Sequence, residues 1–148
     1  MNKKLLRYGL IAVFVAIAFV LFSNRDSSEY PFRSEMRTLP KESALVTEYF
    51  TSAYRVFETE KAYVLEDLEF QITIYDGLVE RYETLEKVPD HALEDYQAML
   101  EAVNEQKEVF EAIYEVAKKG QAIPAELALE LKKVVERRVL YEGRMGRY

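Results

Sequence analysis

The side chains in this sequence that could perform acid–base or metal chemistry are one histidine, His91, and several closely spaced carboxylates. The carboxylates form a pair, Glu58 and Glu60, and a run at residues 66–69. Paired carboxylates act as general acid and base where their surroundings separate their pKa values. These groups lie in a strongly acidic segment, so we expect a solvated helix surface there. His91 follows Asp90 at the predicted start of a helix, where a solvated polar residue is ordinary.

The composition excludes several kinds of functional site. There is no Cys among the 148 residues, which excludes disulfides, thiolate metal sites and thiol nucleophiles. Carboxylate-bridged di-iron bundles use Glu-x-x-His on two helices, and here no His lies three residues after a Glu. The sequence also lacks Gly-x-Ser-x-Gly, a phosphate-binding glycine loop and EF-hand spacing. We therefore predict a non-enzymatic protein with no catalytic residues, no metal and no cofactor.

Eleven tyrosines are the most unusual feature of the composition. Most recur at spacings typical of a helix core, where the ring packs and the hydroxyl reaches the rim. Tyr is also enriched at the energetic centres of protein interfaces. The sequence leaves both interpretations open, and they coincide if a partner completes the core.

The amino-terminal segment predicts a membrane anchor. Lys3, Lys4 and Arg7 precede an uncharged, mainly apolar run at residues 8–22. The excess of basic residues before this run predicts a cytoplasmic stub at 1–7, a transmembrane signal-anchor at 8–22 and an extracytoplasmic remainder. A cleaved signal peptide is the alternative. However, the one Ala-x-Ala, at residues 16–18, lies inside the apolar run and makes a poor cleavage site.

The remainder predicts an all-α fold, an antiparallel three-helix bundle with one long helix. Residues 23–39 lack periodicity and are predicted to be a tether, with the helical domain at 40–146. The helices are expected at about 41–87, 90–119 and 124–143, with Pro89, Gly120 and Pro124 at their ends. Residues 69–75 alternate like a strand, but helical spacing resumes after Gly77, so we expect a helix with a kink there.

The second predicted helix shows the clearest amphipathic pattern, with spacings of three and four throughout. Its predicted inward-facing residues are Leu93, Tyr96, Leu100, Val103, Lys107, Phe110, Tyr114 and Ala117. The first predicted helix carries three apolar rows with a spacing of seven, which gives a broad face rather than a narrow coiled-coil seam. The rows contain Tyr49, Val56, Tyr63 and Phe70, then Phe50, Phe57 and Val64, and then Leu68, Tyr75 and Tyr82.

Charge is distributed unevenly along the chain. Residues 42–119 hold 19 acids and 7 bases, whereas residues 131–148 hold 6 bases and 2 acids. The basic end predicts contact with an anionic surface through Arg137, Arg138, Arg144 and Arg147. Intramolecular pairing of these residues is the alternative. Because the formal net charge of the whole chain is −6, nucleic acid is not an expected partner.

These features together predict a membrane-anchored helical interaction module, an accessory or assembly subunit of a larger envelope or membrane complex. Its partner is expected to be another membrane or envelope protein, or a second copy of the chain. The predicted interface is an exposed aromatic patch near the membrane, formed by Tyr49, Phe50, Val56 and Phe57. Two alternatives remain: a sensory or ligand-binding bundle that signals through a membrane partner, and a secreted helical binding protein.

Overall fold

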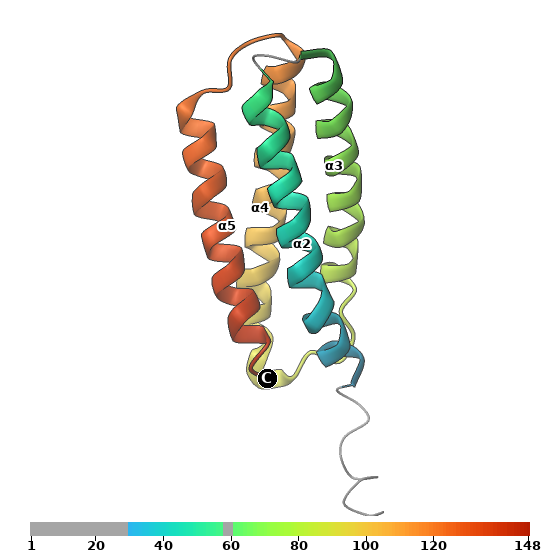
Figure 1. Cartoon of the computed structure of the whole chain (residues 1–148). Helices are drawn as coiled ribbons and strands as arrows, with labels where there is room; N and C mark the ends of the chain where they lie inside the picture. Colours follow the sequence, from blue (N-terminus) through green and yellow to red (C-terminus); the bar gives the residue numbers. More distant parts are fainter. Residues whose placement is uncertain (1–29, 58–60) are drawn as a thin grey trace, which may run out of the picture. The chain divides into compact units, whose positions relative to one another are not determined.

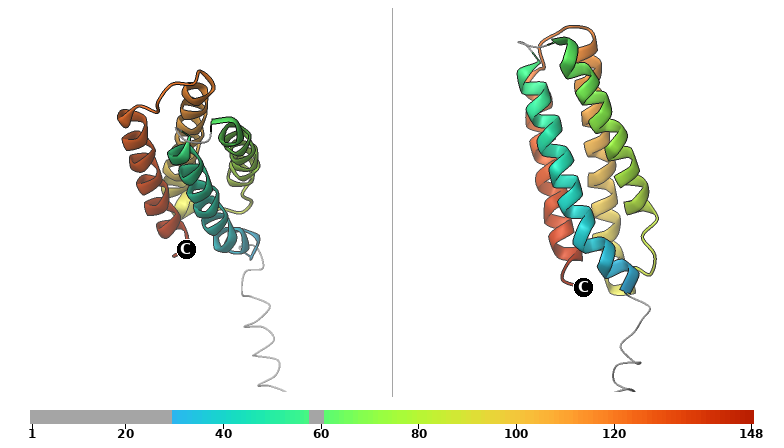
Figure 2. Two further views of the ribbon diagram at one scale, coloured as in Figure 1. Left: turned by 45° about the horizontal axis from the view of Figure 1, so that its top comes forward. Right: turned by 45° about the vertical axis from the view of Figure 1, so that its right-hand side comes forward.

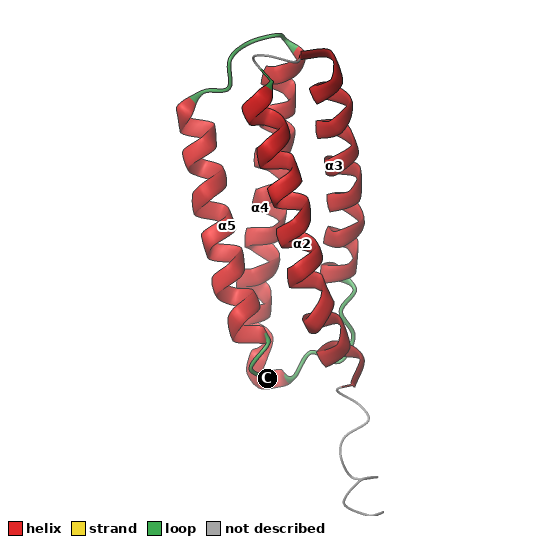
Figure 3. Ribbon diagram, in the orientation of Figure 1, coloured by secondary structure: helices red, strands yellow, loops and turns green. Residues whose placement is uncertain are grey.

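Four α-helices make up the part of the chain that the computed structural model describes, residues 30–57 and 61–148 (Figure 1). They are α2 (Tyr30–Val56), α3 (Lys61–Glu83), α4 (Leu93–Lys118) and α5 (Ala125–Met145), and a short 3₁₀ helix, η1 (Asp90–Ala92), precedes α4. Each helix runs antiparallel to the one before it, and no strand occurs in these ranges (Figure 3). The all-α prediction is confirmed. The predicted count of three helices is wrong, because the described residues form a four-helix bundle.

The apolar spacing of α2 explains why this helix begins about eleven residues earlier than predicted. Pro31 suits the first turn of a helix because its missing N–H has no partner to bond there. From Phe32 onward one face is buried at alternating spacings of four and three. Its members are Phe32, Met36, Leu39, Ser43, Val46, Phe50, Ala53 and Phe57. Residues 30–39 are therefore helix and not tether, and Pro40 lies inside α2.

The predicted long helix at 41–87 is divided into α2 and α3, which lie side by side and run in opposite directions (Figures 1 and 2). A continuous helix of that length would extend about 70 Å, well beyond α4. Folded back, α2 and α3 have 27 and 23 residues and match the 26 and 21 of α4 and α5. The fold therefore covers apolar residues that a single long helix would leave exposed. Residues 69–77 are helical, and α3 continues through Gly77.

The last two helices agree with the predicted ranges to within a few residues. Pro124 caps the start of α5, and Gly120, just after α4, has φ +69°, a conformation that favours glycine. The buried face of α4 is rotated by about one residue from the predicted stripe. It contains Met99, Ala102, Val103, Gln106, Val109, Phe110, Ile113 and Ala117. Leu93 is exposed, and Leu100 and Tyr114 are half-buried against the core.

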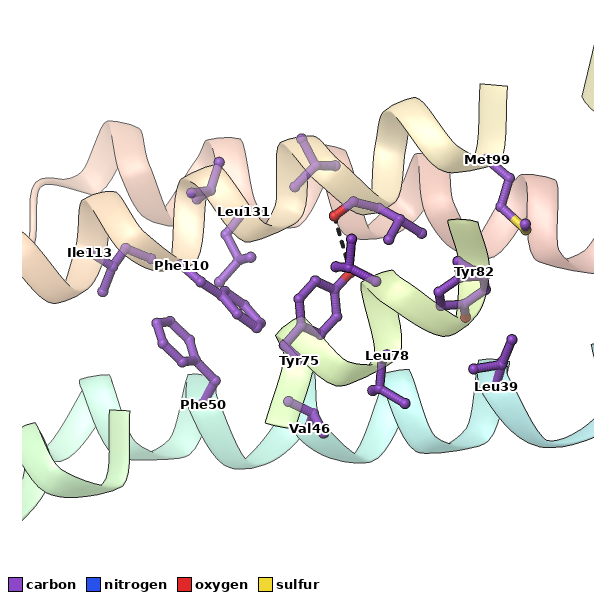
Figure 4. Packing of buried hydrophobic residues seen from close by; sticks show 14 of the residues in the cluster. Leu39, Val46, Phe50, Tyr75, Leu78, Tyr82, Met99, Phe110, Ile113 and Leu131 are labelled. Carbon is purple, nitrogen blue, oxygen red and sulfur yellow. Dashed lines mark hydrogen bonds between the residues drawn. The ribbon is translucent and has the colours of Figure 1, made fainter. Parts of the chain in front are cut away.

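The centre of the bundle is an aromatic cluster contributed by three helices (Figure 4). Phe50 of α2 stacks on Phe110 of α4 with ring centroids 3.8 Å apart, and Tyr75 of α3 packs against Phe110 at 5.0 Å. The Tyr75 hydroxyl donates to the backbone carbonyl of Val103 at 3.4 Å. Phe50, Tyr75 and Phe110 are fully buried, so these contacts position α2 and α3 on α4.

The bundle, Pro31–Tyr148, is one compact unit. The predicted stub at 1–7, span at 8–22 and first part of the tether lie outside the described residues. Within 30–57 and 61–148, no helix combines the length and apolar composition needed to cross a bilayer.

Candidate interaction site

An apolar groove runs along the outer surface between α2 and α3. Its most exposed side chains are Leu45 and Tyr49 of α2, which are 51% and 56% exposed, and Phe70 of α3, which is 60% exposed. Ile74 is 37% exposed, and the groove has a volume of about 390 Å³. Val46 and Leu78, both buried, form its floor. Such large apolar side chains gathered on one surface usually mark a site for another molecule.

The two helices that form the groove are fixed to each other at its lower end. Arg81 of α3 donates from Nη2 to Glu35 of α2 at 2.8 Å, and its Nη1 donates to Glu42. The next residue on each helix faces the core, where Ser43 Oγ and Tyr82 Oη are 2.9 Å apart. These contacts tie α3 to α2 on both sides of the interhelical seam. The groove is therefore a preformed feature of the bundle.

The charged residues that flank the groove are mostly acidic, and Lys41, four residues before Leu45, is the exception. Glu48 lies three residues after Leu45, and Glu66 and Asp67 lie four and three residues before Phe70. Residues three or four apart share a helix face, so all three carboxylates border the apolar strip. All three are exposed to solvent. The site therefore combines an apolar floor with a negative rim.

The predicted aromatic patch is divided between the core and the surface. Phe50 and Phe57 are buried, at 0% and 2% exposure, and Phe50 stacks on Phe110 of α4. The expectation that these two side chains are exposed is wrong. Tyr49 and Val56 are exposed, and Tyr49 lines the groove. The groove thus retains Tyr49 alone of the predicted patch and adds residues from α3 that were not assigned to it.

Three of the four arginines predicted to contact an anionic surface have carboxylate partners within the bundle. Arg137 pairs with Glu105, and Arg144 Nη1 donates to Asp95 at 3.0 Å. Arg138 lies in the core beside Glu142, so it is not available to any surface. The expected exposure of Arg138 is wrong.

Arg147, the fourth of these arginines, is exposed near the end of the chain. Its Nε donates to the backbone carbonyl of Gly143 at 3.3 Å. Of the four arginines predicted to contact an anionic surface, Arg147 alone forms no ion pair in the described part of the chain.

The core also contains a polar cluster that joins α2, α3 and α5. Tyr82 donates its hydroxyl hydrogen to Glu142, and Arg138 Nη1 lies 3.4 Å from the same carboxylate oxygen. Burial raises the pKa of the Tyr82 phenol well above its usual range, and Glu142 raises it further. Burial also raises the pKa of the Glu142 carboxyl, and Arg138 opposes this shift. We infer that this cluster fixes the register of the helices relative to one another, because its members face one another inside the bundle.

The side chains first considered for chemistry do not converge. His91 is exposed, and its ring meets the edge of Tyr148 at 5.1 Å. Glu66, Asp67 and Glu69 point to solvent from α3, whereas Glu58 and Glu60 lie outside the described residues. No group of three His, Cys, Asp or Glu side chains suited to hold a metal ion occurs in the described ranges.

The comparisons with known proteins give no relative: no family model, no curated protein and no solved structure matches this chain. The groove must therefore be interpreted from its own residues. The sequence did contain a signal for it, because the first predicted helix has parallel apolar rows. The row with Phe50 is buried, whereas Tyr49, Val56 and Phe70 of the neighbouring row are exposed.

Proposed function

We propose that this protein is a membrane-anchored docking module without catalytic activity, and that its α2–α3 groove binds a helix of a partner protein. The observation that carries the proposal is the strip formed by Leu45, Tyr49, Phe70 and Ile74. An amphipathic helix is the natural occupant of an elongated apolar groove between two helices. The anchor at residues 8–22 is part of the proposal and keeps the bundle at the membrane surface.

The charge around the groove specifies the chemistry of the partner. Glu48, Glu66 and Asp67 would face the flanks of a bound helix, so basic flanks are favoured. A symmetric dimer through the groove would bring the same acidic rim against itself. Like charges at an interface are unfavourable, so the rim favours a basic partner over a second copy.

Paired probe peptides test the groove and its rim. One peptide is an amphipathic helix with Lys at its flanking positions, and the other has Glu at the same positions. Three rim contacts at about 0.2–1 kcal/mol each predict that the Lys peptide binds the full chain roughly tenfold more tightly. Tyr49→Ser with Phe70→Ser should abolish binding. The matched control is Leu129→Ser with Leu140→Ser, which removes side chains 53% and 51% exposed on α5.

Equal binding of the two peptides, or equal loss in the groove and control variants, would refute the proposal. A dimer that dissociates in the groove variant would show that a second copy is the occupant. The anchor is tested separately by the intact mass of the mature protein: a chain that begins after residue 18 or 22 would contradict it.

A further inference from the structure

Gln71 interrupts the row of α3 residues that faces the core. This row recurs at alternating spacings of four and three, the pattern of a helix that packs along its whole length. Its other members in the described part of α3 are apolar or aromatic, and all of them are buried: Val64, Leu68, Tyr75, Leu78 and Tyr82. Gln71 lies between Leu68 and Tyr75 and is half-buried. The core-facing row of α3 therefore carries an amide at one position.

The interruption lies at the α2–α3 groove. Gln71 lines the groove together with Phe70 and Ile74 of α3. Glu42, the one charged residue among the described residues that line it, is already bonded to Arg81. By contrast, the Gln71 carboxamide has no hydrogen-bond partner in the described part of the chain. Its two donors and its acceptor are therefore open to another molecule.

The bundle itself gives no reason for an amide at this position. A leucine there would complete the apolar row and bury more apolar surface, which stabilises a fold. Gln71 makes no hydrogen bond within the described ranges that would offset this loss. A residue that weakens packing at the edge of a binding groove is typical of a position that selects a partner.

A helix bound in the groove would change the surroundings of the Gln71 amide. In the free protein the half-buried amide can hydrogen-bond to water. An apolar side chain placed against it would exclude that water and leave the amide unpaired, which is unfavourable. A side-chain amide on the bound helix would instead pair with it, because each carboxamide both donates and accepts. In coiled coils, one buried polar residue fixes register and partner choice in this way.

We propose that Gln71 selects the occupant of the groove: a basic-flanked amphipathic helix that carries Asn or Gln at one position of its otherwise apolar face. This inference rests on the proposed function, and it adds the feature by which the groove distinguishes one amphipathic helix from another. Pairing with Gln71 would also fix the register of the bound helix along the groove, because the apolar contacts alone do not define it.

A set of Lys-flanked helical peptides tests this selection. One peptide has Leu at every position of its apolar face, and in each of the others Asn replaces a single Leu. Fluorescence anisotropy measures the affinity of each labelled peptide for the full chain in neutral detergent. We expect one Asn position to bind about tenfold more tightly than the all-Leu peptide, the usual effect of pairing a buried amide that is otherwise unpaired.

Gln71→Leu should reverse this preference, so that the all-Leu peptide binds more tightly than the favoured Asn peptide. The matched control is Gln97→Leu, the same substitution at an exposed position of α4, and it should leave the preference unchanged. Circular dichroism shows whether the helices remain. Gln71→Ala, which removes the amide without adding a larger apolar group, should abolish the preference and provides a second test.

The outcomes separate this inference from the proposed function. If the all-Leu peptide binds the wild type as tightly as every Asn peptide, the groove is a docking site but Gln71 does not select its occupant. An equal change of preference in Gln97→Leu would also overturn the role of Gln71. If no peptide binds, the proposed function itself is wrong, and the inference is wrong with it.

Discussion

Replacing Arg138 by Met tests whether the buried charge pair of the core is essential to the fold. The Arg138 side chain is 1% exposed, and its charged partner is Glu142, with 3.4 Å between Nη1 and Oε1. Arg138 Nε has no hydrogen-bond partner among the described residues, so the guanidinium is incompletely compensated. Met is shorter than Arg but has a similar volume, and it carries no charge. The substitution therefore removes the charge with little change in packing.

The expected loss in the free energy of unfolding is about 3–5 kcal/mol at pH 7, the usual cost of leaving one member of a buried ion pair alone. The loss should depend on pH. The pKa of Glu142 is already raised by burial, and without Arg138 it rises further. A raised carboxyl pKa means that folding takes up a proton between the unfolded and folded pKa values. Stability is therefore gained as the pH falls, by up to about 1.4 kcal/mol per pH unit.

Adding Glu142→Gln to Arg138→Met should restore most of the stability. The double variant buries no charge, and Gln can still accept the hydrogen bond from Tyr82. Replacing both members of a buried pair by neutral groups is often neutral or stabilising. The exposed control, Arg55→Met, should change the free energy of unfolding by less than about 0.5 kcal/mol.

Urea unfolding of the full chain, followed by circular dichroism at several pH values, measures these differences. A loss of less than about 1 kcal/mol for Arg138→Met at pH 7 would show that the buried charge pair is not essential to the fold. A double variant as unstable as the single one would show that the unpaired charge of Glu142 is not the cause of the loss.

Four further predictions concern the bundle and use the same unfolding measurements. Phe110→Ala should lower the free energy of unfolding by about 3–5 kcal/mol, since Phe110 is fully buried in the aromatic cluster. Gly77→Ala should raise it by about 0.5–1 kcal/mol, because nothing lies within 4 Å of an added Cβ in this helix interior. Gly120→Ala should lower it by roughly 1 kcal/mol, because φ there is +69°. Hydrogen bonds from Tyr148 and Arg144 hold the pKa of Asp95 below its usual range, so this stabilisation is present near neutral pH and is lost as the pH falls below about 4. Asp95→Asn should therefore flatten the acid side of the stability profile, and an unchanged profile would contradict the assignment.

The helices that the sequence predicts well are those with clear chemical boundaries. Pro89 and Pro124 precede α4 and α5, and Gly120 follows α4 with the backbone conformation expected of a C-terminal glycine. No such residue lies between α2 and α3, where the sequence reads Glu-Thr-Glu. In addition, Phe57 and Val64 continue the spacing of seven across the reversal. The local pattern therefore predicted one helix, whereas burial of the row with Phe50, Phe57 and Val64 required two.

The candidate site could be predicted only in part, for the same physical reason. Tyr49 and Phe50 are adjacent and similarly apolar, and nothing local decides which of the two faces the core. The packing of the other helices determines which of the two is buried, because it covers Phe50 and leaves Tyr49 exposed. Arg138 is a similar case, because a buried charge depends on Glu142 one turn later and on Tyr82 from another helix.

Photo-crosslinking in native membranes tests docking at the groove most directly. A photoreactive phenylalanine analogue is placed at Phe70 in the groove or, as a control, at Leu140, which is 51% exposed on α5. Adducts are identified by mass spectrometry. We predict that Phe70 gives one dominant adduct, on the basic amphipathic helix of a partner protein, and that Leu140 does not. Equal labelling from the two positions, or adducts at Phe70 with lipid alone, would contradict the proposed function.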